Sequence, residues 1–279
     1  MARILLVGAS SGIGEATALD LAGSGHDVVA TVRTEAARED LLARASLDGS
    51  EMEVLLLEVT DAEAVAHTVE LVAHSGGLDA LVHNAGRGFV GTLEQLTEAD
   101  VRRCLEINFF GVVHTVRTVL PILREGGGGH VVVVSSVGGA VGQPFNDAYC
   151  AAKFAVEGLL ESLHPAVAPY GIAVSIIEPG PVATKFVDNV QGIEALLGAS
   201  PDAPYAKERA AYIGRVGASF ANAQSAEDVA RVIREVLASD DPDLRYQTSE
   251  ASRAFVSTKL SDLTGRAVTA MTAEWVRPA

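Results

Sequence analysis

The chain has 279 residues, 48% of them hydrophobic and 20% charged, which is enough to bury a large core as one α/β domain or two small ones. Its 21 Lys and Arg stand against 36 Asp and Glu, giving a formal net charge of −15. A surface this acidic repels phosphate backbones and argues against nucleic acid as a partner. The hydrophobic content also excludes a disordered chain.

The ends and the cysteines indicate a cytoplasmic setting. The apolar run Ile4-Leu5-Leu6-Val7 is broken at Gly8, so it is too short for a secretory signal. No stretch reaches the roughly 18 uninterrupted apolar residues that a membrane span needs. Two cysteines are too few for a disulfide scaffold, and a reducing compartment fits best. We therefore expect a cytoplasmic protein without a membrane span.

Short β-branched runs alternate with amphipathic stretches from the first residues onward. The runs are nearly continuously apolar, which is typical of strands buried on both faces of a parallel sheet. Such alternation predicts βαβ units and a doubly wound α/β sheet with helices on both faces. In chain order, the expected strands are residues 3–7, 27–32, 53–57, 79–83, 130–135 and 172–177, with a seventh near 244–247. The expected helices are residues 13–22, 35–45, 62–74, 98–123 and 148–168.

No linker divides the chain, so we expect one domain over residues 1–279. The glycine run at 126–129 is interpreted as a connecting turn. Residues 184–222 depart from the alternation just past a strand end, a place where lids and binding loops occur. The C-terminal extension, residues 249–279, either covers the pocket or lies at a subunit interface. Apolar side chains in the lid segment favour an apolar ligand, unless they simply pack on the core: Phe186, Ile193, Leu196, Leu197 and Phe220.

A glycine-rich turn joins the first expected strand to the first helix. It reads Gly8-Ala9-Ser10-Ser11-Gly12-Ile13-Gly14. Glycines there permit a tight turn and let backbone N–H groups approach a pyrophosphate at the helix N-terminus, where the helix dipole favours negative charge. A plain turn is the alternative, but the position between strand and helix favours a dinucleotide site. No Gly-Lys-Ser/Thr follows, which argues against an NTPase loop.

The second expected strand ends in Val32-Arg33. In dinucleotide folds an acidic residue at this point bonds the ribose hydroxyls of NAD, whereas an Arg accommodates the 2′-phosphate of NADP. Arg33, helped by the Ser10 hydroxyl, therefore favours NADP(H), with NAD(H) still possible. The alternative is a solvated surface Arg.

Three polar features form a candidate catalytic group. Tyr149 and Lys153 are four residues apart at the start of an expected helix, so one turn places them on the same face. Ser136 follows the strand at 130–135, at a carboxyl end where α/β folds build their sites. Asn108 is an amide among apolar neighbours within the long helical stretch 98–123. Each feature alone has another interpretation: Tyr149 and Lys153 could be a surface pair, and Ser136 a strand-end turn former. Asn108 could be a buried amide with its hydrogen bonds satisfied.

In order along the chain, these motifs resemble those of the short-chain dehydrogenase/reductase family. The resemblance runs from residue 3 to about residue 184, and the stretch from Ser136 to Cys150 is most similar to the hydroxysteroid and retinol dehydrogenase branch. It implies a Rossmann-type fold and an oxidoreductase that moves hydride between nicotinamide and an alcohol/carbonyl substrate. The motifs are Gly8-x-x-x-Gly12-Ile13-Gly14, Asn84-Ala85-Gly86, Asn108, Ser136, Tyr149-x-x-x-Lys153 and Pro179-Gly180-Pro181.

The resemblance also implies roles for the catalytic residues. Tyr149 is expected to be the general acid/base, and Lys153 to hold the nicotinamide ribose. Ser136 is expected to bond the substrate oxygen, and Asn108 to support a water that links Lys153 to solvent. A cation about 4 Å from the phenol would also lower the pKa of Tyr149 from about 10 by roughly three units.

Further cofactor contacts follow from the resemblance. Asn84, Ala85 and Gly86 are expected on the adenosine side, and the Thr184 hydroxyl is expected to bond the carboxamide. Glu58 stands where the family has Asp, so its own contact is less certain than that of the Val59 backbone. The expected cofactor-binding set is Gly8, Ser10, Ser11, Gly12, Ile13, Gly14, Arg33, Glu58, Val59, Asn84, Ala85, Gly86, Tyr149, Lys153, Pro179, Gly180, Val182 and Thr184.

A sensing protein and a redox-assisted epimerase or dehydratase are the alternatives to a dehydrogenase. A dinucleotide-sensing protein without chemistry has no need of a proton donor, and a redox-assisted epimerase or dehydratase would show no net cofactor turnover. No His or Cys spacing suggests a metal site. Partners are expected to be a small-molecule substrate and, by family analogy, further copies of this chain in a homodimer or homotetramer.

Overall fold

The computed structural model describes residues 1–184, 190–198, 200 and 202–277. A seven-stranded, wholly parallel sheet runs through it in the order β3-β2-β1-β4-β5-β6-β7. The strands are β1 Arg3–Val7, β2 Asp27–Val32, β3 Glu53–Leu56, β4 Ala80–His83, β5 Gly129–Val134, β6 Ile172–Glu178 and β7 Arg245–Gln247.

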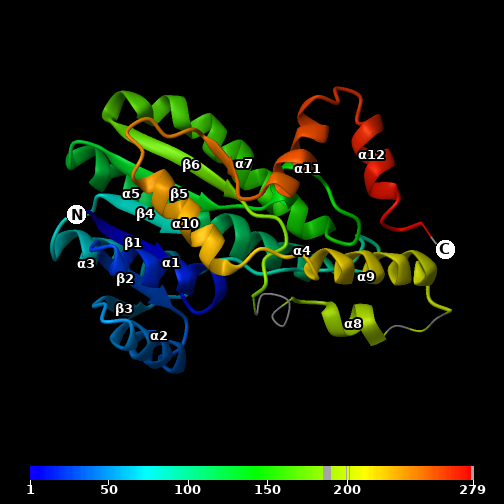
Figure 1. The fold of residues 1–279 in the computed structure, drawn as a ribbon, viewed down its shortest axis with the longest axis horizontal. Coiled ribbons are helices and arrows are strands. Elements are labelled where there is room, and N and C mark those ends of the chain that lie inside the picture. The colour runs from blue at the N-terminus through cyan, green and yellow to red at the C-terminus, as the bar shows by residue number, and fades with distance from the viewer. Residues whose placement is uncertain (185–189, 199, 201, 278–279) are drawn as a thin grey trace.

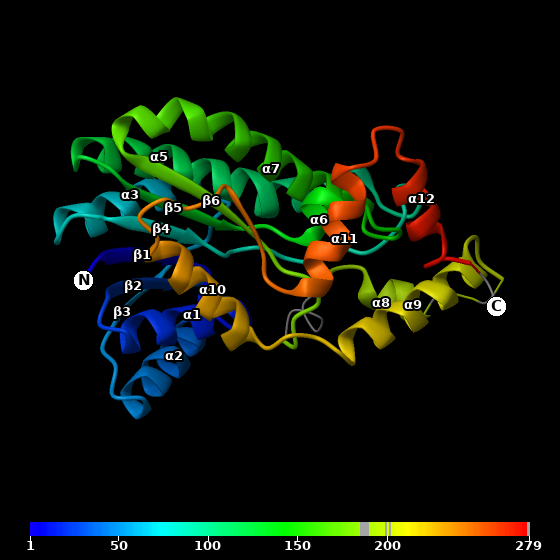
Figure 2. The same cartoon turned by 45° about the horizontal axis from the view of Figure 1, so that its top comes forward.

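Helices cover both faces of the sheet, with α3, α5 and α7 on one side and α1, α2 and α10 on the other (Figure 2). Helices α8, α9, α11 and α12 lie apart from these layers, beyond one end of the strands (Figures 1 and 2). The α-helices are α1 Gly12–Gly23, α2 Glu35–Leu47, α3 Ala62–His74, α4 Glu98–Leu105, α5 Gly111–Glu125, α6 Val137–Ala140, α7 Asp147–Val167, α8 Ile193–Gly198, α9 Ala206–Phe220, α10 Ala226–Leu237, α11 Glu250–Leu260 and α12 Arg266–Ala273. A π-helix, η1 Glu106–Phe110, and a 3-10 turn, η2 Ala168–Tyr170, complete the set.

The core consists of two apolar layers because successive strand residues point to opposite faces. In β1, Leu5 and Val7 belong to the layer under α3, α5 and α7, whereas Ile4 and Leu6 belong to the layer under α1, α2 and α10. All four side chains are fully buried. Burial on both faces explains why the strands have continuous rather than alternating apolar runs.

The strand order indicates at which point along the sheet a ligand site is expected. The chain moves outward from β1 to β2 and β3, and then returns to place β4 on the other side of β1. In open α/β sheets, ligands bind at the carboxyl ends of the strands beside such a reversal. The glycine turn after β1 and the Asn84 segment after β4 both lie at this point.

The doubly wound fold expected from the sequence is confirmed, with strand ends shifted by at most one residue. Helix α10 was not expected, although Ser225 and Asp228 form a capping box that marks its start. The helices of the C-terminal extension, α11 and α12, were not expected either. None of the helices in the described residues is long and apolar enough to cross a bilayer.

The single long helix expected over residues 98–123 is wrong in one respect, because η1 divides it into α4 and α5. Asn108 lies in η1, and its Nδ2 donates to the Cys104 carbonyl at 3.1 Å. A side-chain amide that bonds a carbonyl four residues back competes with the backbone ladder. π-Helical turns of this kind occur frequently at functional sites.

Candidate active site

The glycine turn packs closely against the segment after β4. Gly8 has φ 93°, and a Cβ atom there would lie 2.6 Å from the Ala85 backbone. Asn84 Nδ2 donates to the Gly8 carbonyl at 2.7 Å. A Cβ atom at Gly14 would lie 2.1 Å from the same carbonyl oxygen. The turn can therefore take this shape only with glycine at Gly8 and Gly14.

The N-terminus of α1 opens beside this turn. Its N-cap residue, Ser11, has extended backbone angles and makes no side-chain capping hydrogen bond. The first-turn N–H groups of α1 are thus left for another acceptor, and the helix dipole favours an anionic one. This arrangement fits the pyrophosphate of a dinucleotide.

The adenosine side is formed by the ends of β2 and β3. Arg33 is exposed just after β2 and has neither a hydrogen bond nor an ion pair within the described residues. The Glu58 carboxylate turns back to accept hydrogen bonds from the backbone and hydroxyl of Thr60, at 3.2 and 3.1 Å. Val59 is buried, and its carbonyl oxygen lies 3.2 Å from His114 Nδ1. The Val59 backbone is therefore held in place.

Ser136 and Tyr149 meet over Gly138. Ser136 caps α6, its Oγ accepting the Gly138 N–H at 3.0 Å, and a side-chain hydrogen bond joins it to Tyr149. A Cβ atom at Gly138 would lie 3.4 Å from both Ser136 Oγ and Tyr149 Cε1. The two hydroxyls, 13 residues apart in the chain, thus face one another as the sequence predicts.

Lys153 is buried one turn beyond Tyr149 on α7. Its Nζ donates to the Val134 carbonyl at 3.0 Å and lies 5.9 Å from the centre of the Tyr149 ring. Burial lowers the pKa of Lys153 to about 8, and Glu157 partly offsets this. The Lys153 amine is thus able to gain or lose a proton near neutral pH.

The expected lowering of the Tyr149 pKa is contradicted. Burial raises the pKa of the phenol, and the hydrogen bond from Ser136 only partly opposes this. The Lys153 amine donates to the Val134 carbonyl and is not among the groups that lower the pKa of Tyr149. Desolvation disfavours the phenolate more than the groups around it favour it. The protonated form of the Tyr149 phenol is therefore favoured at neutral pH.

Asn108 is fully buried and braces the loop after β4. Its Oδ1 accepts the Arg87 N–H at 2.9 Å, and its Nδ2 donates to the Arg87 carbonyl at 3.0 Å. Gly86 separates Asn108 from Lys153: a Cβ atom there would lie 3.0 Å from Asn108 Oδ1 and 3.6 Å from Lys153 Nζ. Asn108 is thus a near neighbour of the buried amine across a glycine.

The segment after β6 packs against α6, against α11 and against Gly12 of the glycine turn. The Val137 N–H donates to the Pro179 carbonyl at 3.0 Å, which ties this segment to α6. A Cβ atom at Gly180 would lie 2.6 Å from Ser252 Oγ on α11. Thr184 packs on Gly12, whose Cβ would lie 2.9 Å from the threonine side chain.

One cavity of about 1030 Å³ connects these groups. Every expected site residue lines it except Gly14, which lies beneath the turn. Of the expected lid side chains, Ile193, Leu196, Leu197 and Phe220 line it, whereas Phe186 falls outside the described residues. The lining residues not foreseen include Gln143, Asn146, Tyr212, Arg215, Phe255 and Trp275.

Structural contacts around the loop before α7 explain part of the missed set. Phe145 has φ 61°, and its ring packs against Tyr212, with centroids 5.1 Å apart. The next residue, Asn146, donates to the Tyr212 hydroxyl at 2.7 Å. The loop before α7 is thereby fixed to α9. An aromatic residue held in the left-handed region is rare, but sequence alone does not show it.

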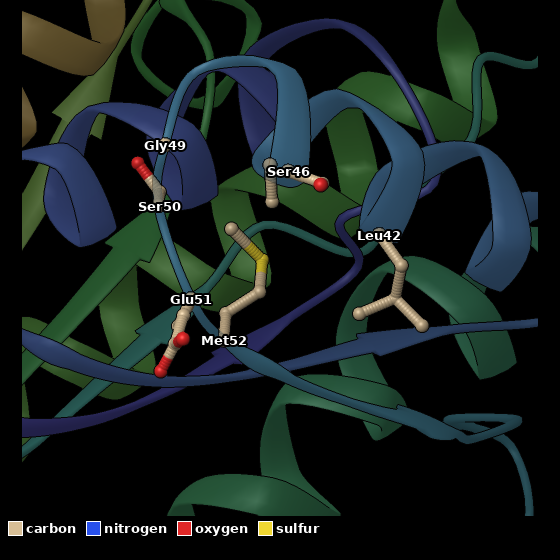
Figure 3. Close-up of a pocket in the computed structure, with 7 residues that line it drawn as sticks. Leu42, Ser46, Gly49, Ser50, Glu51 and Met52 are labelled. Carbon is tan, nitrogen blue, oxygen red and sulfur yellow. The ribbon is translucent and has the colours of Figure 1, made fainter.

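A second hollow, of about 480 Å³, lies where α2 leads into β3. Figure 3 shows Met52 in its middle, between Leu42 and Ser50. None of the motif residues borders it, so it carries no part of the proposed chemistry. Within the described part of the chain, no group of three His, Cys, Asp or Glu side chains is arranged to hold a metal ion.

Comparison with known proteins identifies the family. The short chain dehydrogenase family matches residues 2–194. The chain is 40% identical to 17-beta-hydroxysteroid dehydrogenase type 1 of Homo sapiens, covering 97% of this chain and 85% of that protein. It is 37% identical to retinol dehydrogenase 8 of Bos taurus, covering 94% and 86%.

Solved structures agree. A short-chain dehydrogenase from Streptomyces avermitilis superimposes with a TM-score of 0.79 at 33% identity, covering 98% of this chain and 95% of that one. Two others at 25% identity, with TM-scores of 0.80 and 0.75, are complexes with NAD and with NADPH respectively. The resemblance found in the motifs is thereby confirmed. The chain belongs to the short-chain dehydrogenase family of nicotinamide-dependent oxidoreductases, in its hydroxysteroid and retinol dehydrogenase branch.

Proposed function

We propose that the protein is an NADP(H)-dependent oxidoreductase that interconverts an apolar ketone or aldehyde and its alcohol, with Tyr149 as general acid/base. One observation carries the proposal. The Ser136–Tyr149 hydroxyl pair and the buried Lys153 line the same cavity as the glycine turn. A proton donor and a dinucleotide cradle in one cavity are what carbonyl reduction by hydride requires.

The residues present fit the cofactor. The uncapped N-terminus of α1 suits the pyrophosphate, and the glycines Gly8 and Gly14 let the turn beside that N-terminus pack tightly against Asn84 and Ala85. Lys153 would hold the nicotinamide ribose, and Pro179, Gly180, Val182 and Thr184 would surround the carboxamide end. When bound, the nicotinamide supplies or accepts the hydride.

The protein's own part in the reaction is the handling of the proton. In reduction, Ser136 donates a hydrogen bond to the carbonyl oxygen, which stabilises the negative charge that develops there. Tyr149, whose pKa is raised by burial, is protonated and delivers its proton to that oxygen. The ammonium of Lys153 stabilises the phenolate left behind. Asn108 would position a water that returns a proton through Lys153.

The preference for NADP(H) is supported by Arg33. The guanidinium is exposed at the end of β2, borders the cavity and has no carboxylate partner among the described residues. A 2′-phosphate offers it a charge-assisted, bidentate contact that a ribose hydroxyl does not. Ser10, which also borders the cavity, would add a hydroxyl donor.

The preference for an apolar substrate is supported by the residues that cover the cavity. Side chains from the lid segment 184–222 and from the C-terminal extension line its outer part, among them Ile193, Leu196, Phe220, Phe255 and Trp275. The similar proteins named for hydroxysteroids and retinol point the same way. Both segments would close over a rigid or elongated hydrocarbon and exclude water from the reacting carbon.

The test is to follow NADPH consumption by absorbance with purified protein over steroid, retinoid, aliphatic and quinone carbonyls. We expect turnover with at least one apolar class and far less with small polar carbonyls. Stoichiometric NADPH binding with no turnover on any class would instead support a sensing protein. Product formed without net NADPH loss would indicate an epimerase or dehydratase.

A further inference from the structure

A cluster of buried carboxylates near Lys153 does not line the cavity. Glu157 is one helical turn beyond Lys153 on α7, and its side chain is 7% exposed. Glu178, at the end of β6, is fully buried. Arg245 on β7 joins them: its Nε lies 3.1 Å from Glu157 Oε2 and 3.4 Å from Glu178 Oε1. Nothing in the proposed proton transfer uses this cluster.

The cluster has more negative than positive charge. Arg245 also contacts Glu161 at 2.6 Å, but that carboxylate is 63% exposed and water screens it. The two buried carboxylates thus share one guanidinium. The next buried cation along α7 is Lys153. The set of Lys153, Arg245 and the two carboxylates is electrically neutral when Lys153 is charged and both carboxylates are ionised. It is also neutral when Lys153 is uncharged and one carboxyl group is protonated.

The space for Glu157 is built into the fold. A Cβ atom at Gly139 would lie 2.6 Å from Ser135 Oγ and 3.0 Å from Glu157 Oε1. Glycine at this position in α6 therefore admits the Glu157 carboxyl group beside the Ser135 hydroxyl, which lowers the pKa of that carboxyl. Glu157 and Lys153 are both buried and lie one turn apart on the same face of α7, so the carboxylate and the amine interact electrostatically.

The other titratable groups that face Lys153 are neutral near pH 7. Burial lowers the pKa of His83 on β4 to about 3, so its imidazole is uncharged. Burial raises the pKa of Cys104 on α4 to about 12 and also raises that of Tyr149. Glu157 is the remaining group, and it in turn faces Glu161, Glu178 and Arg245.

We propose that Glu157 is a positioning residue whose carboxylate keeps the buried Lys153 side chain protonated, with Arg245 and Ser135 keeping Glu157 ionised. Opposite charges within a low-dielectric interior favour each other's charged forms. Arg245 and the Ser135 hydroxyl lower the pKa of Glu157, whereas burial and Glu178 raise it to about 7. The Arg245 guanidinium, 3.1 Å from Glu157 Oε2, therefore favours the ionised carboxylate beside the buried amine.

The test measures the titration of Lys153 directly. The chain has four lysines, at positions 153, 185, 207 and 259. Protein labelled with ¹³C at the lysine Cε therefore gives few NMR signals, and a Lys153→Met variant assigns the one of interest. The Cε shift, followed against pH in the wild type, Glu157→Gln, Ser135→Ala and Glu161→Gln, reports the pKa of each amine.

We expect Glu157→Gln to lower the pKa of Lys153 by about one unit or more, a tenfold change in its proton affinity. Ser135→Ala should lower the pKa of Lys153 by less, because the Glu157 carboxyl group then keeps its own proton to a higher pH. Glu161→Gln, which removes the exposed carboxylate from the same arginine, should not lower it. If Glu157→Gln does not fold, Ser135→Ala decides the question.

The proposal would be overturned if Lys153 had the same pKa in the wild type and in Glu157→Gln. If Glu157→Gln does not fold, an unchanged Lys153 pKa in Ser135→Ala would overturn it instead. So would an equal fall in Glu161→Gln. The consequence for catalysis rests on the proposed function, but the titration needs no substrate. A shifted Lys153 pKa with an unshifted pH profile of NADPH oxidation would support the electrostatic role of Glu157 and contradict the proposed role of Lys153.

Discussion

At the scale of single residues, the site is governed by burial. Desolvation raises the pKa of Tyr149 and lowers that of Lys153, so each neutral form is favoured relative to water. This is why the sequence-based expectation of an activated phenol was wrong: the spacing of Tyr149 and Lys153 shows that they share a helix face, but it does not show their depth. Depth depends on the chain segments that pack around them.

The pH dependence of reduction follows from the lysine. Lys153 is charged below a pKa of about 8 and neutral above it, and only the charged form stabilises the phenolate that forms as Tyr149 gives up its proton. We therefore expect kcat/KM for NADPH-dependent reduction to fall as the pH rises through about 8. Lys153→Arg, which remains charged, should lose this fall, although at lower overall activity. A wild-type profile that is flat from pH 6 to about 9 would contradict this role.

The cofactor preference depends on Arg33. We expect Arg33→Ala to reduce the ratio of NADPH to NADH affinity by about ten- to a hundredfold, because a bidentate contact to phosphate is lost. The measurement is the dissociation constant of each cofactor from its fluorescence on binding. Arg38→Ala, which removes an exposed arginine paired with Glu35 on α2, is the matched control. An unchanged ratio in Arg33→Ala would refute the assignment.

At the scale of elements, the sequence predicts the central sheet well and its surroundings poorly. The buried strands follow from apolar runs, and α3 was expected at its observed bounds. In contrast, η1 interrupts a helix whose pattern is continuous, because one buried amide, that of Asn108, bonds backward to Cys104. Helices α11 and α12 have mixed patterns because they pack on each other while α11 also packs on α6 and β7, so no single apolar face stands out.

The C-terminal extension is joined to the lid segment by aromatic contacts. Trp275 stacks on Phe255 of α11 with centroids 5.6 Å apart, and the Arg215 guanidinium of α9 lies 5.5 Å from the centre of its ring. All three residues line the cavity. These contacts favour the extension as a cover of the pocket, one of the two roles that the sequence leaves open.

We expect Trp275→Ala to raise KM for an apolar substrate several-fold, since both the cation–π contact and the apolar cover are removed. The dissociation constant of NADPH should remain nearly unchanged. Leu263→Ala, which truncates an exposed side chain of the same extension, serves as the control. A KM equal to that of the wild type would show that the extension does not cover the substrate.

At the scale of the whole molecule, topology brings distant motifs together. Ser136, Tyr149 and Lys153 follow β5, and the glycine turn follows β1, yet all border one cavity because parallel strands end at the same edge. The sequence contains these motifs and their order, so the inner site was predictable. The outer site was not, since residues such as Asn146 and Tyr212 acquire meaning only when α9 packs against α7.

Assembly is a further proposal at this scale. Phe110 and Phe154 are more than a third exposed, on the long helical segments through which we expect copies of this chain to pair. We expect light scattering to give about twice or four times the chain mass of 29.0 kDa. A Phe110→Ser, Phe154→Ser double variant should shift that mass toward the single chain. A wild-type protein that elutes as one chain would contradict this expectation.

The central claim is that the Tyr149 hydroxyl delivers the proton. The most direct measurement compares Tyr149→Phe with the wild type in NADPH binding and in turnover of the same carbonyl substrate. We expect a dissociation constant for NADPH within about threefold of the wild type and a kcat reduced by at least about a hundredfold, as the loss of a general acid gives. Tyr149→Phe protein that turns over at near the wild-type rate would contradict it.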